Sequence, residues 1–232
     1  LIEAQHLSDY TIYAPNLNAR LDSLPIRSGD FDKTAAAHAL DRPSITGDAI
    51  AHYNRLANRQ PAIVFCCTVA HAEPVAPSFR AAGYLAATLL GTDTPDHRDR
   101  LVADFTAGHI QILVTVDVVS EGFDVPAASC AILLRPTQSE SLYLQQVGRV
   151  LRPSPNKTQA LILDHVGNVH RHGFPDDDRQ WTLDDARKRT RAGGPPPPSV
   201  RTCEQCFAAF RPQPICPVCG HSCTTQNSRR IK

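Results

Sequence analysis

The stretch Ser139–Pro153, with the sequence SESLYLQQVGRVLRP, carries the pattern from which the rest of the chain can be interpreted. Thr137 and Glu140 have the spacing of a capping box, which predicts that a helix begins here. At 100° per residue, one face of this helix is apolar and consists of Leu144, Val147, Val150 and Leu151. The opposite face consists of Gln145, Gly148, Arg149 and Arg152. One side can therefore pack on a core while the other presents two guanidinium groups.

These two guanidinium groups suit a polyphosphate ligand. Arginine keeps its charge in proteins, and its planar fork matches the geometry of phosphate oxygens. The competing interpretation is a solvated basic stripe, which is the common situation for two arginines on a helix. The neighbouring segments decide between the two interpretations.

Three segments of the chain, in the expected order, resemble motifs of superfamily 2 helicases. They are Ala62–Cys66 for motif IV, Thr115–Asp124 for motif V, and Gln145, Gly148, Arg149 and Arg152 for motif VI. The resemblance covers about residues 8 to 183, and together with a cysteine-rich tail it is most similar to the RadD-type and related branch. In this family the three motifs belong to the second of two RecA-like motor domains.

The resemblance implies a role for each motif residue at the nucleotide. Arg149 and Arg152 would be arginine fingers that reach the γ-phosphate of ATP, which is bound with Mg²⁺ on a first RecA-like domain of the same protein. Gln145 would help to position that nucleotide. The same cleft would be lined by Glu121, Gly122, Asp124 and Gly148. Taken alone, Gly122 could equally be a turn glycine and Asp124 a cap.

The resemblance also implies contacts with the backbone of a nucleic acid, on the opposite edge of the domain. Thr68 lies between a strand and a helix, where its hydroxyl and the helix N-terminal amides could bind a phosphate. Thr115 matches a threonine that contacts phosphate in the family. The preference for DNA over RNA rests on the family branch alone.

The pattern of apolar runs predicts an α/β fold with a RecA-like parallel sheet flanked by helices on both faces. Short runs that are apolar on both faces alternate with helical segments, which is typical of such sheets. The expected strands are Tyr10–Pro15, Ala62–Cys66, Tyr84–Leu89, Gln111–Val116, Cys130–Leu134 and Gln159–Leu163. The expected helices are Asp30–Asp41, Ser44–Arg59, Val69–Ala82, Asp96–Gly108 and the one in Ser139–Pro153.

The tail predicts a small zinc ribbon. Cys203, Cys206, Cys216 and Cys219 form two C-x-x-C pairs, the ligand set of a closed tetrahedral Zn²⁺ site, although a redox dithiol or an iron site could use the same thiols. The expected organisation is a lead-in segment 1–29, a RecA-like domain 30–185, a Gly/Pro-rich linker 186–200, the zinc ribbon 201–224 and a basic tail 225–232. Reduced thiols and the lack of a long apolar run predict a cytoplasmic protein with no membrane partner.

Two absences shape the functional hypothesis. The sequence contains neither G-x-x-x-x-G-K-[ST] nor an Asp-Glu pair, so the phosphate-cradling and magnesium-holding parts of a P-loop motor are missing from it. The chain also has no methionine and is expected to be a fragment that begins after a first motor domain, with negligible ATPase activity alone. The net charge of +1 excludes a polycation, so nucleic acid must bind to a local patch.

The function predicted from the sequence is therefore the second motor domain of an ATP-dependent helicase or translocase acting on nucleic acid, with DNA repair as the expected process. One alternative is a non-catalytic module with a RecA-like fold and a zinc ribbon that binds DNA or protein. Another is the translocating subunit of a restriction or excision nuclease, although no paired carboxylates typical of a nuclease are visible.

Overall fold

The computed structural model describes residues 6–15, 21–40, 43–57, 59–116, 125, 127–155, 157–179 and 199–223. Five parallel strands form the centre of the fold: β4 (Ala62–Cys66), β5 (Ala86–Leu89), β6 (Ile112–Val116), β7 (Cys130–Leu133) and β8 (Ala160–Asp164). Four of them, all except β5, are buried along their whole length. The predicted parallel α/β sheet is confirmed, because runs of aliphatic residues without polar alternation need cover on both faces.

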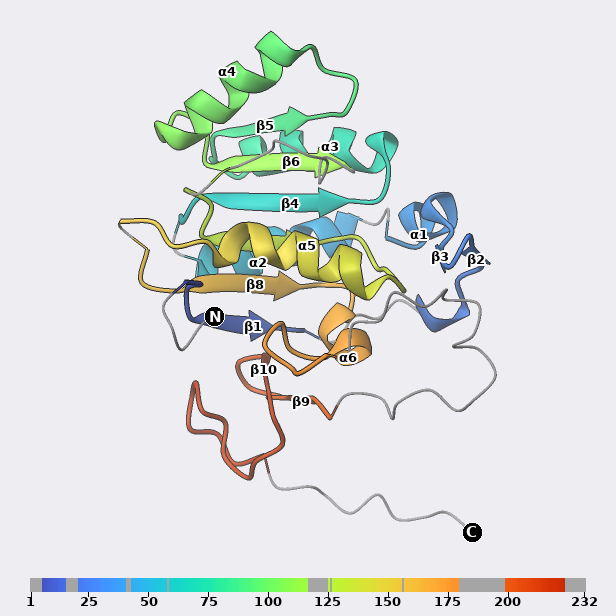
Figure 1. Ribbon diagram of the computed structural model, residues 1–232, viewed down its shortest axis with the longest axis vertical. Helices are drawn as coiled ribbons and strands as arrows, with labels where there is room; N and C mark the ends of the chain where they lie inside the picture. The colour runs from blue at the N-terminus through green and yellow to red at the C-terminus, as the bar shows by residue number, and fades with distance from the viewer. Residues whose placement is uncertain are drawn as a thin grey trace.

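Helices cover both faces of this sheet. The helices in the described residues are α1 (Lys33–Leu40), which lies beside β2 and β3 and away from the sheet in Figure 1, α2 (Pro43–Leu56), α3 (Val69–Ala81), α4 (Pro95–Thr106), α5 (Glu140–Leu151) and α6 (Asn168–His172). In Figure 1, α5 crosses the near face of β7 and β8, whereas α2 and α3 lie behind the sheet. Within the described ranges, no helix is both long and apolar enough to cross a bilayer.

The sheet is longer than the sequence pattern indicates, because the cysteine tail adds β9 and β10 to it. Its order is β5-β6-β4-β7-β8-β1-β10-β9. The strand β1 (Tyr10–Tyr13) pairs in parallel with β8 and antiparallel with β10 (Ala208–Phe210), which in turn pairs with β9 (Arg201–Thr202). The lead-in segment is thus partly a strand of the main sheet, and the cysteine tail continues that sheet instead of standing apart (Figure 1).

Of the described residues that follow β1, Leu21–Ser23 form a short 3-10 helix, and β2 (Ile26–Arg27) forms a hairpin with β3 (Asp30–Phe31). The expected helix from Asp30 therefore begins three residues later, at Lys33, because Asp30 and Phe31 belong to the hairpin. The Asp32 carboxylate accepts the backbone N–H of Ala35 at 2.8 Å, as a helix-capping side chain does. The linker and the basic tail lie outside the described residues, except for positions 199 and 200.

Candidate functional site

The helix α5, which carries the two candidate arginines, begins two residues later than a capping box from Thr137 to Glu140 would place it. Ser139 is the N-cap, and its Oγ accepts the N–H of Leu142 at 3.3 Å. Thr137 Oγ1 accepts the N–H of Ser139 at 2.9 Å instead. The predicted pairing of Thr137 with Glu140 is therefore wrong, because the Glu140 carboxylate binds a side chain from elsewhere in the fold.

That side chain is Arg179, which holds the first turn of α5 in place. Its Nε donates to Oε1 of Glu140 at 2.7 Å. Its other donors bind carbonyls at the end of α6 and in the loop that follows it, those of His172, Phe174, Pro175 and Asp177, at 2.7 to 3.2 Å. The guanidinium is nearly buried, with 9% of the side chain exposed. Sequence reasoning did not single out Arg179, since bonds from a side chain to distant carbonyls leave no periodic signal.

The buried face of α5 is shifted from the predicted one. It consists of Tyr143, Gln146, Val147, Val150 and Leu151, whereas Leu144 is only partly buried. Tyr143 can be buried because its hydroxyl donates to the carbonyl of Gly173 at 3.2 Å. The opposite face remains as predicted, with Gln145 exposed and Gly148 and Arg149 partly exposed.

Arg149 and Arg152 differ in backbone position. Arg149 lies in the last turn of α5, whereas Arg152 is the C-cap, with φ −64° and ψ 133°, and has left the helix. Both side chains are partly exposed. A Cβ built onto Gly148 would meet no atom within 4 Å among the described residues. Packing within the described part of the chain therefore does not require a glycine between Gln145 and Arg149.

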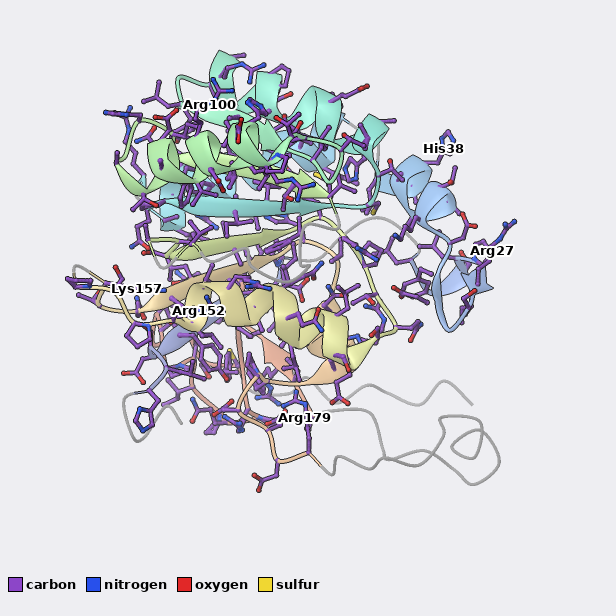
Figure 2. All side chains as sticks on the ribbon, turned by 45° about the horizontal axis from the view of Figure 1, so that its top comes forward. Arg27, His38, Arg100, Arg152, Lys157 and Arg179 are labelled. Carbon is purple, nitrogen blue, oxygen red and sulfur yellow. The ribbon has the colours of Figure 1, made fainter. Side chains whose placement is uncertain are left out.

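Two of the described candidate residues, Thr68 and Arg152, lie at opposite edges of the sheet. Thr68 follows the carboxyl end of β4, whereas α5 runs back along the sheet and brings Arg152 to the edge where the strands begin. In Figure 2, Arg152 lies at one end of α5 beside Lys157, and Arg179 lies toward the other end.

The candidate phosphate ligands have different surroundings. Thr68 is the N-cap of α3, where its Oγ1 accepts the N–H of His71 at 3.1 Å and the side chain is partly exposed. Thr115 lies within β6 and is 1% exposed, and its Oγ1 has no hydrogen-bond partner in the described structure. A contact between this hydroxyl and a surface phosphate would need the end of β6 to open. Glu121, Gly122 and Asp124 lie outside the described residues.

Other polar residues at the carboxyl edge of the sheet are used inside the fold. The Asp30 carboxylate accepts hydrogen bonds from the Thr137 hydroxyl and from the N–H of Gln138 at 2.6 Å. The buried Asp164 accepts the N–H groups of Val166 and Val169 at 3.2 and 2.7 Å. Burial raises the pKa of Asp164. These groups fix the loops from which a ligand site could be built.

The four cysteines predicted as metal ligands lie together. Their sulfur atoms are all within 4.8 Å of one another, and the Sγ–Sγ distances are 3.6 Å for Cys203 with Cys219 and 3.6 Å for Cys206 with Cys216. A tetrahedral site with Zn–S bonds of about 2.3 Å requires sulfur atoms about 3.8 Å apart. The donor set therefore fits a tetrahedral metal ion.

Backbone amides around the first cysteine pair favour the thiolate. Burial raises the pKa of Cys203. Hydrogen bonds from the N–H groups of Cys206 and Gln205 act in the opposite direction, and the resulting pKa is about 6. The residue after the pair is Phe207, with φ +67°, in the left-handed region that Gly220 occupies with φ +73° after the second pair. A side chain in this conformation costs about 1 kcal/mol, so Phe207 needs compensating contacts.

Phe207 obtains those contacts from α2. Its ring lies edge-on to His52, with 5.5 Å between ring centroids, and beneath the Arg55 guanidinium, also at 5.5 Å. Its carbonyl accepts the N–H of Ala14 at 2.8 Å. Residues 201–223 are called the cysteine module here. This module therefore packs against the main sheet and against α2.

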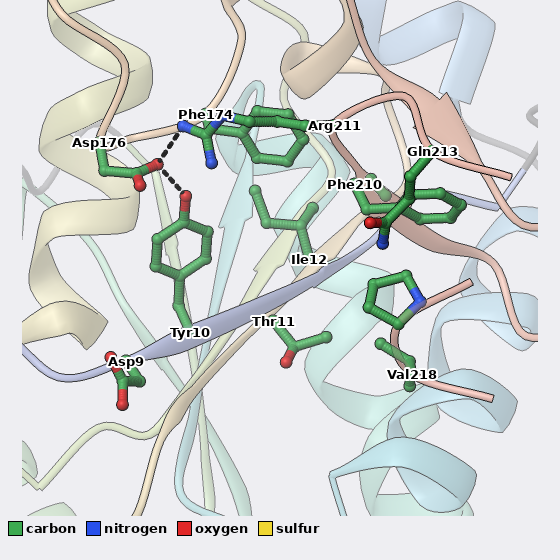
Figure 3. Close-up of a pocket in the computed structure, with 12 residues that line it drawn as sticks. Asp9, Tyr10, Thr11, Ile12, Phe174, Asp176, Phe210, Arg211, Gln213 and Val218 are labelled. Carbon is green, nitrogen blue, oxygen red and sulfur yellow. Dashed lines mark hydrogen bonds and ion pairs between the residues drawn. The ribbon is translucent and has the colours of Figure 1, made fainter. Parts of the chain in front are cut away.

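A second contact docks the cysteine module beside a groove of about 540 Å³ (Figure 3). Arg211 binds Asp176 at 3.1 Å and Asp177 at 2.7 Å, and its guanidinium lies 4.8 Å from the centre of the Phe174 ring. The Tyr10 hydroxyl donates to the same Asp176 carboxylate. The first strand, the loop after α6 and the cysteine module thus meet at one carboxylate.

Known proteins provide an independent comparison. Residues 46–154 match the helicase conserved C-terminal domain family. A 51.5 kDa protein of a Lactococcus phage is 35% identical over 95% of this chain and 48% of its own length. A candidate mitochondrial ATP-dependent helicase of Schizosaccharomyces pombe, irc3, is 36% identical over 49% of this chain and 19% of its own length. The chain therefore spans about half the length of the first relative and much less of the second.

The fold is also similar to that of a solved helicase structure. The RNA helicase Prp28 from Chaetomium thermophilum, solved with ADP, aligns over 70% of this chain and 33% of its own length, with 19% identity and a TM-score of 0.50. At this identity the likeness concerns the fold alone. Together, the family match and the fold indicate that residues 46–154 of this chain form a helicase conserved C-terminal domain.

Proposed function

We propose that this chain supplies the nucleotide-sensing half of an ATP-dependent helicase or translocase. The observation that carries the proposal is α5, which lies inside the family match and presents Gln145, Arg149 and Arg152 away from the core. The whole protein would bind ATP with Mg²⁺ on a first RecA-like domain. The role of this chain would be to stabilise negative charge on the transferred phosphoryl group.

Arg149 and Arg152 act as arginine fingers in this proposal. Each guanidinium carries a permanent charge and can donate two parallel hydrogen bonds to phosphate oxygens. The open space over Gly148 supports the same view, because a glycine that no described neighbour requires leaves room for an approaching group. Glu121, Gly122 and Asp124 complete the cleft in this proposal through their resemblance to motif V.

Nucleic acid binds at the other edge of the sheet. The partly exposed Thr68 begins α3, whose N-terminal amides carry partial positive charge and suit a backbone phosphate. Thr115 joins the contact only after a rearrangement of the end of β6, because its side chain is buried. We propose DNA as the track, from the resemblance to the RadD-type branch. RNA is the alternative, since relatives include proteins named as RNA helicases, such as DBP10 of Yarrowia lipolytica.

The cysteine module holds Zn²⁺ through Cys203, Cys206, Cys216 and Cys219. Each ligand offers one sulfur, and two of the sulfur–sulfur distances already match a tetrahedron to within about 0.2 Å. The ion would be structural and would cross-link a module that is too small to bury a core of its own. Its position next to β1 suggests that it stabilises the end of the motor sheet.

The experiment that tests this function is ATP turnover by the full-length protein with double-stranded DNA, single-stranded DNA and RNA compared side by side. Turnover that requires Mg²⁺ and rises with one nucleic acid is the expected result. Robust turnover by the 232-residue chain alone would contradict a nucleotide site that is shared between two domains. Absence of turnover under all conditions would favour a non-catalytic binding module.

A further inference from the structure

The carbonyl groups at the C-terminal end of α5 have donors from outside the helix. The last turn of a helix leaves its carbonyls without intrahelical partners. Here the carbonyl of Leu151 accepts the N–H of Ser8 at 2.7 Å. The carbonyls of Val150 and Arg152 accept the Lys157 ammonium, with 2.8 Å for Arg152. The end of α5 is therefore held by two residues that are not part of it.

Lys157 uses its full donor capacity at this point. An ammonium group has three N–H donors, and Lys157 Nζ has three carbonyl acceptors, those of Val150, Arg152 and Ala128, the last at 2.8 Å. Ala128 precedes β7, so one side chain ties the end of α5 to the beginning of a central strand. Burial lowers the pKa of Lys157 to about 8, so the ammonium form with its three donors prevails at neutral pH.

The backbone of Arg152 depends on such external bonds. Because Arg152 is the C-cap of α5, its carbonyl lies outside the helical hydrogen-bond ladder. Pro153 restricts the preceding residue to extended conformations, in agreement with ψ 133° at Arg152. Lys157 then fixes the direction of the Arg152 carbonyl, and with it the position from which the Arg152 side chain starts. The positive charge of Lys157 also suits the negative end of the helix dipole.

We propose that Lys157 is a positioning residue for ATP hydrolysis, which sets the place of Arg152 by binding the carbonyl end of α5. This inference rests on the proposed function, since it concerns the role of Arg152 at the nucleotide. Lys157 itself does not contact the nucleotide in this scheme. Its contribution is geometric, and a shift of about 1 Å in a catalytic group can cost about 10²-fold in rate.

The test is a double-mutant cycle in the full-length protein, with Lys157→Met, Arg152→Ala and the two changes combined. Nucleic-acid-stimulated turnover and the KM for ATP are measured well below the melting temperature of the least stable variant. We expect Lys157→Met to lower kcat roughly tenfold or more, with little change in nucleic-acid affinity in the absence of nucleotide. Lys157→Arg should restore part of the loss, because a guanidinium can still donate to several carbonyls.

The combined variant gives the decisive result. If Lys157 acts through Arg152, the double variant turns over ATP no more slowly than Arg152→Ala alone. Effects that multiply, or a normal kcat in Lys157→Met, would overturn the inference. The matched control is Lys33→Met, which changes an exposed lysine of α1 and should leave kcat unchanged. A fully active Arg152→Ala variant would contradict the proposed function itself. This outcome differs from those that contradict only the role of Lys157.

Discussion

The Nε atom of Arg179 lies 2.7 Å from Oε1 of Glu140, so a residue beyond α6 is bound to the first turn of α5. The same guanidinium donates to four carbonyls at the end of α6 and in the loop that carries Asp176 and Asp177. Those aspartates in turn bind Arg211 of the cysteine module. Guanidinium contacts with carboxylates and with backbone carbonyls therefore connect α5 to the cysteine module.

Arg179→Met should destabilise the protein by about 3 kcal/mol, because it leaves several carbonyls and the Glu140 carboxylate without their donor. Urea unfolding measures this loss. Glu140→Gln is the matched control and should cost much less, since the carbonyl bonds of Arg179 remain. Equal losses of unfolding free energy in the two variants would mean that the stabilisation comes from the Arg179–Glu140 ion pair and not from the hydrogen bonds between Arg179 and the carbonyls.

Arg149→Ala and Arg152→Ala should change stability by no more than about 1 kcal/mol, because both side chains are partly exposed. In the full-length protein each should nevertheless lower nucleic-acid-stimulated turnover by about 10² or more, as expected for an arginine finger. Arg149→Lys should rescue poorly, since an ammonium lacks the planar fork.

The contrary outcome for the arginines is informative. Normal turnover combined with weaker nucleic-acid binding and a smaller salt dependence would show that the polar face of α5 is a backbone-binding patch. Nucleic-acid affinity without nucleotide is therefore measured over a range of salt concentrations for each variant.

One zinc ion per chain is expected from elemental analysis of the reduced protein. Cys203→Ser combined with Cys219→Ser removes two of the four clustered sulfur atoms and should abolish binding. Cys223→Ser is the control, since this sulfur lies outside the cluster of four, and it should retain the metal. Iron in place of zinc would support a metal site at the four cysteines but would show that the bound ion is not zinc.

Phe207→Gly should separate docking of the cysteine module from its folding. The change removes the strain at φ +67° together with the ring contacts to His52 and Arg55. We expect retained metal and faster hydrogen exchange at the Ala14 amide, which is bonded to the Phe207 carbonyl. The amide of Cys203, bonded to Ala208 within the module, should stay protected.

The control for this variant is Val218→Ala, which shortens an exposed side chain on the second cysteine pair. It should leave both amides protected. Loss of protection at Cys203 as well as Ala14 in Phe207→Gly would show that docking and folding of the module are one event.

The free energy of unfolding should fall in acid because of His165, which is 1% exposed and stacked on His52 at 5.2 Å. Burial, followed by the proximity of His52, lowers the pKa of His165 to about 3. Between this value and the ordinary one, near 6.5, the unfolded chain binds more protons than the native protein. The contribution of His165 to stability is thus fully present above pH ~6.5 and is lost as pH falls toward about 3.

Urea unfolding from about pH 7.5 to about pH 5 measures this dependence. His165→Leu should lose less stability over the interval than the unchanged protein. His97→Leu, which changes an exposed histidine of α4, should retain the original slope. An unchanged slope in His165→Leu would assign the acid sensitivity to other groups.

Sequence reasoning located the central strands closely because each is an uninterrupted aliphatic run bounded by polar residues. The predicted strand Ala62–Cys66 is confirmed residue for residue, and the predicted helix Val69–Ala82 ends only one residue too late. The clustering of the four cysteines could be predicted as well, since C-x-x-C pairs have few other uses in so short a segment.

The features that were missed depend on contacts between distant parts of the chain. The strands β9 and β10 have two and three residues, which are too few for a recognisable alternation. The strand β1 can be predicted from the sequence, but the strands with which it pairs cannot. Lys157 and Arg179 bind carbonyls, and a carbonyl is present in every residue, so no sequence pattern marks them. Tyr143 displaced Leu144 from the buried face because its hydroxyl finds a partner inside.

The position of β1 between β8 and β10 has a consequence for biosynthesis. The strand Tyr10–Tyr13 is synthesised before both of its neighbours in the sheet, which are encoded about 150 and 200 residues later. Until β8 is made, β1 exposes two unpaired edges, and until the cysteine module docks it still exposes one, a hazard for association with other chains. Of the strands around β1, those of the cysteine module are made last. If this module folds around the proposed metal ion, metal supply would govern the yield of folded protein before it affects any rate of hydrolysis.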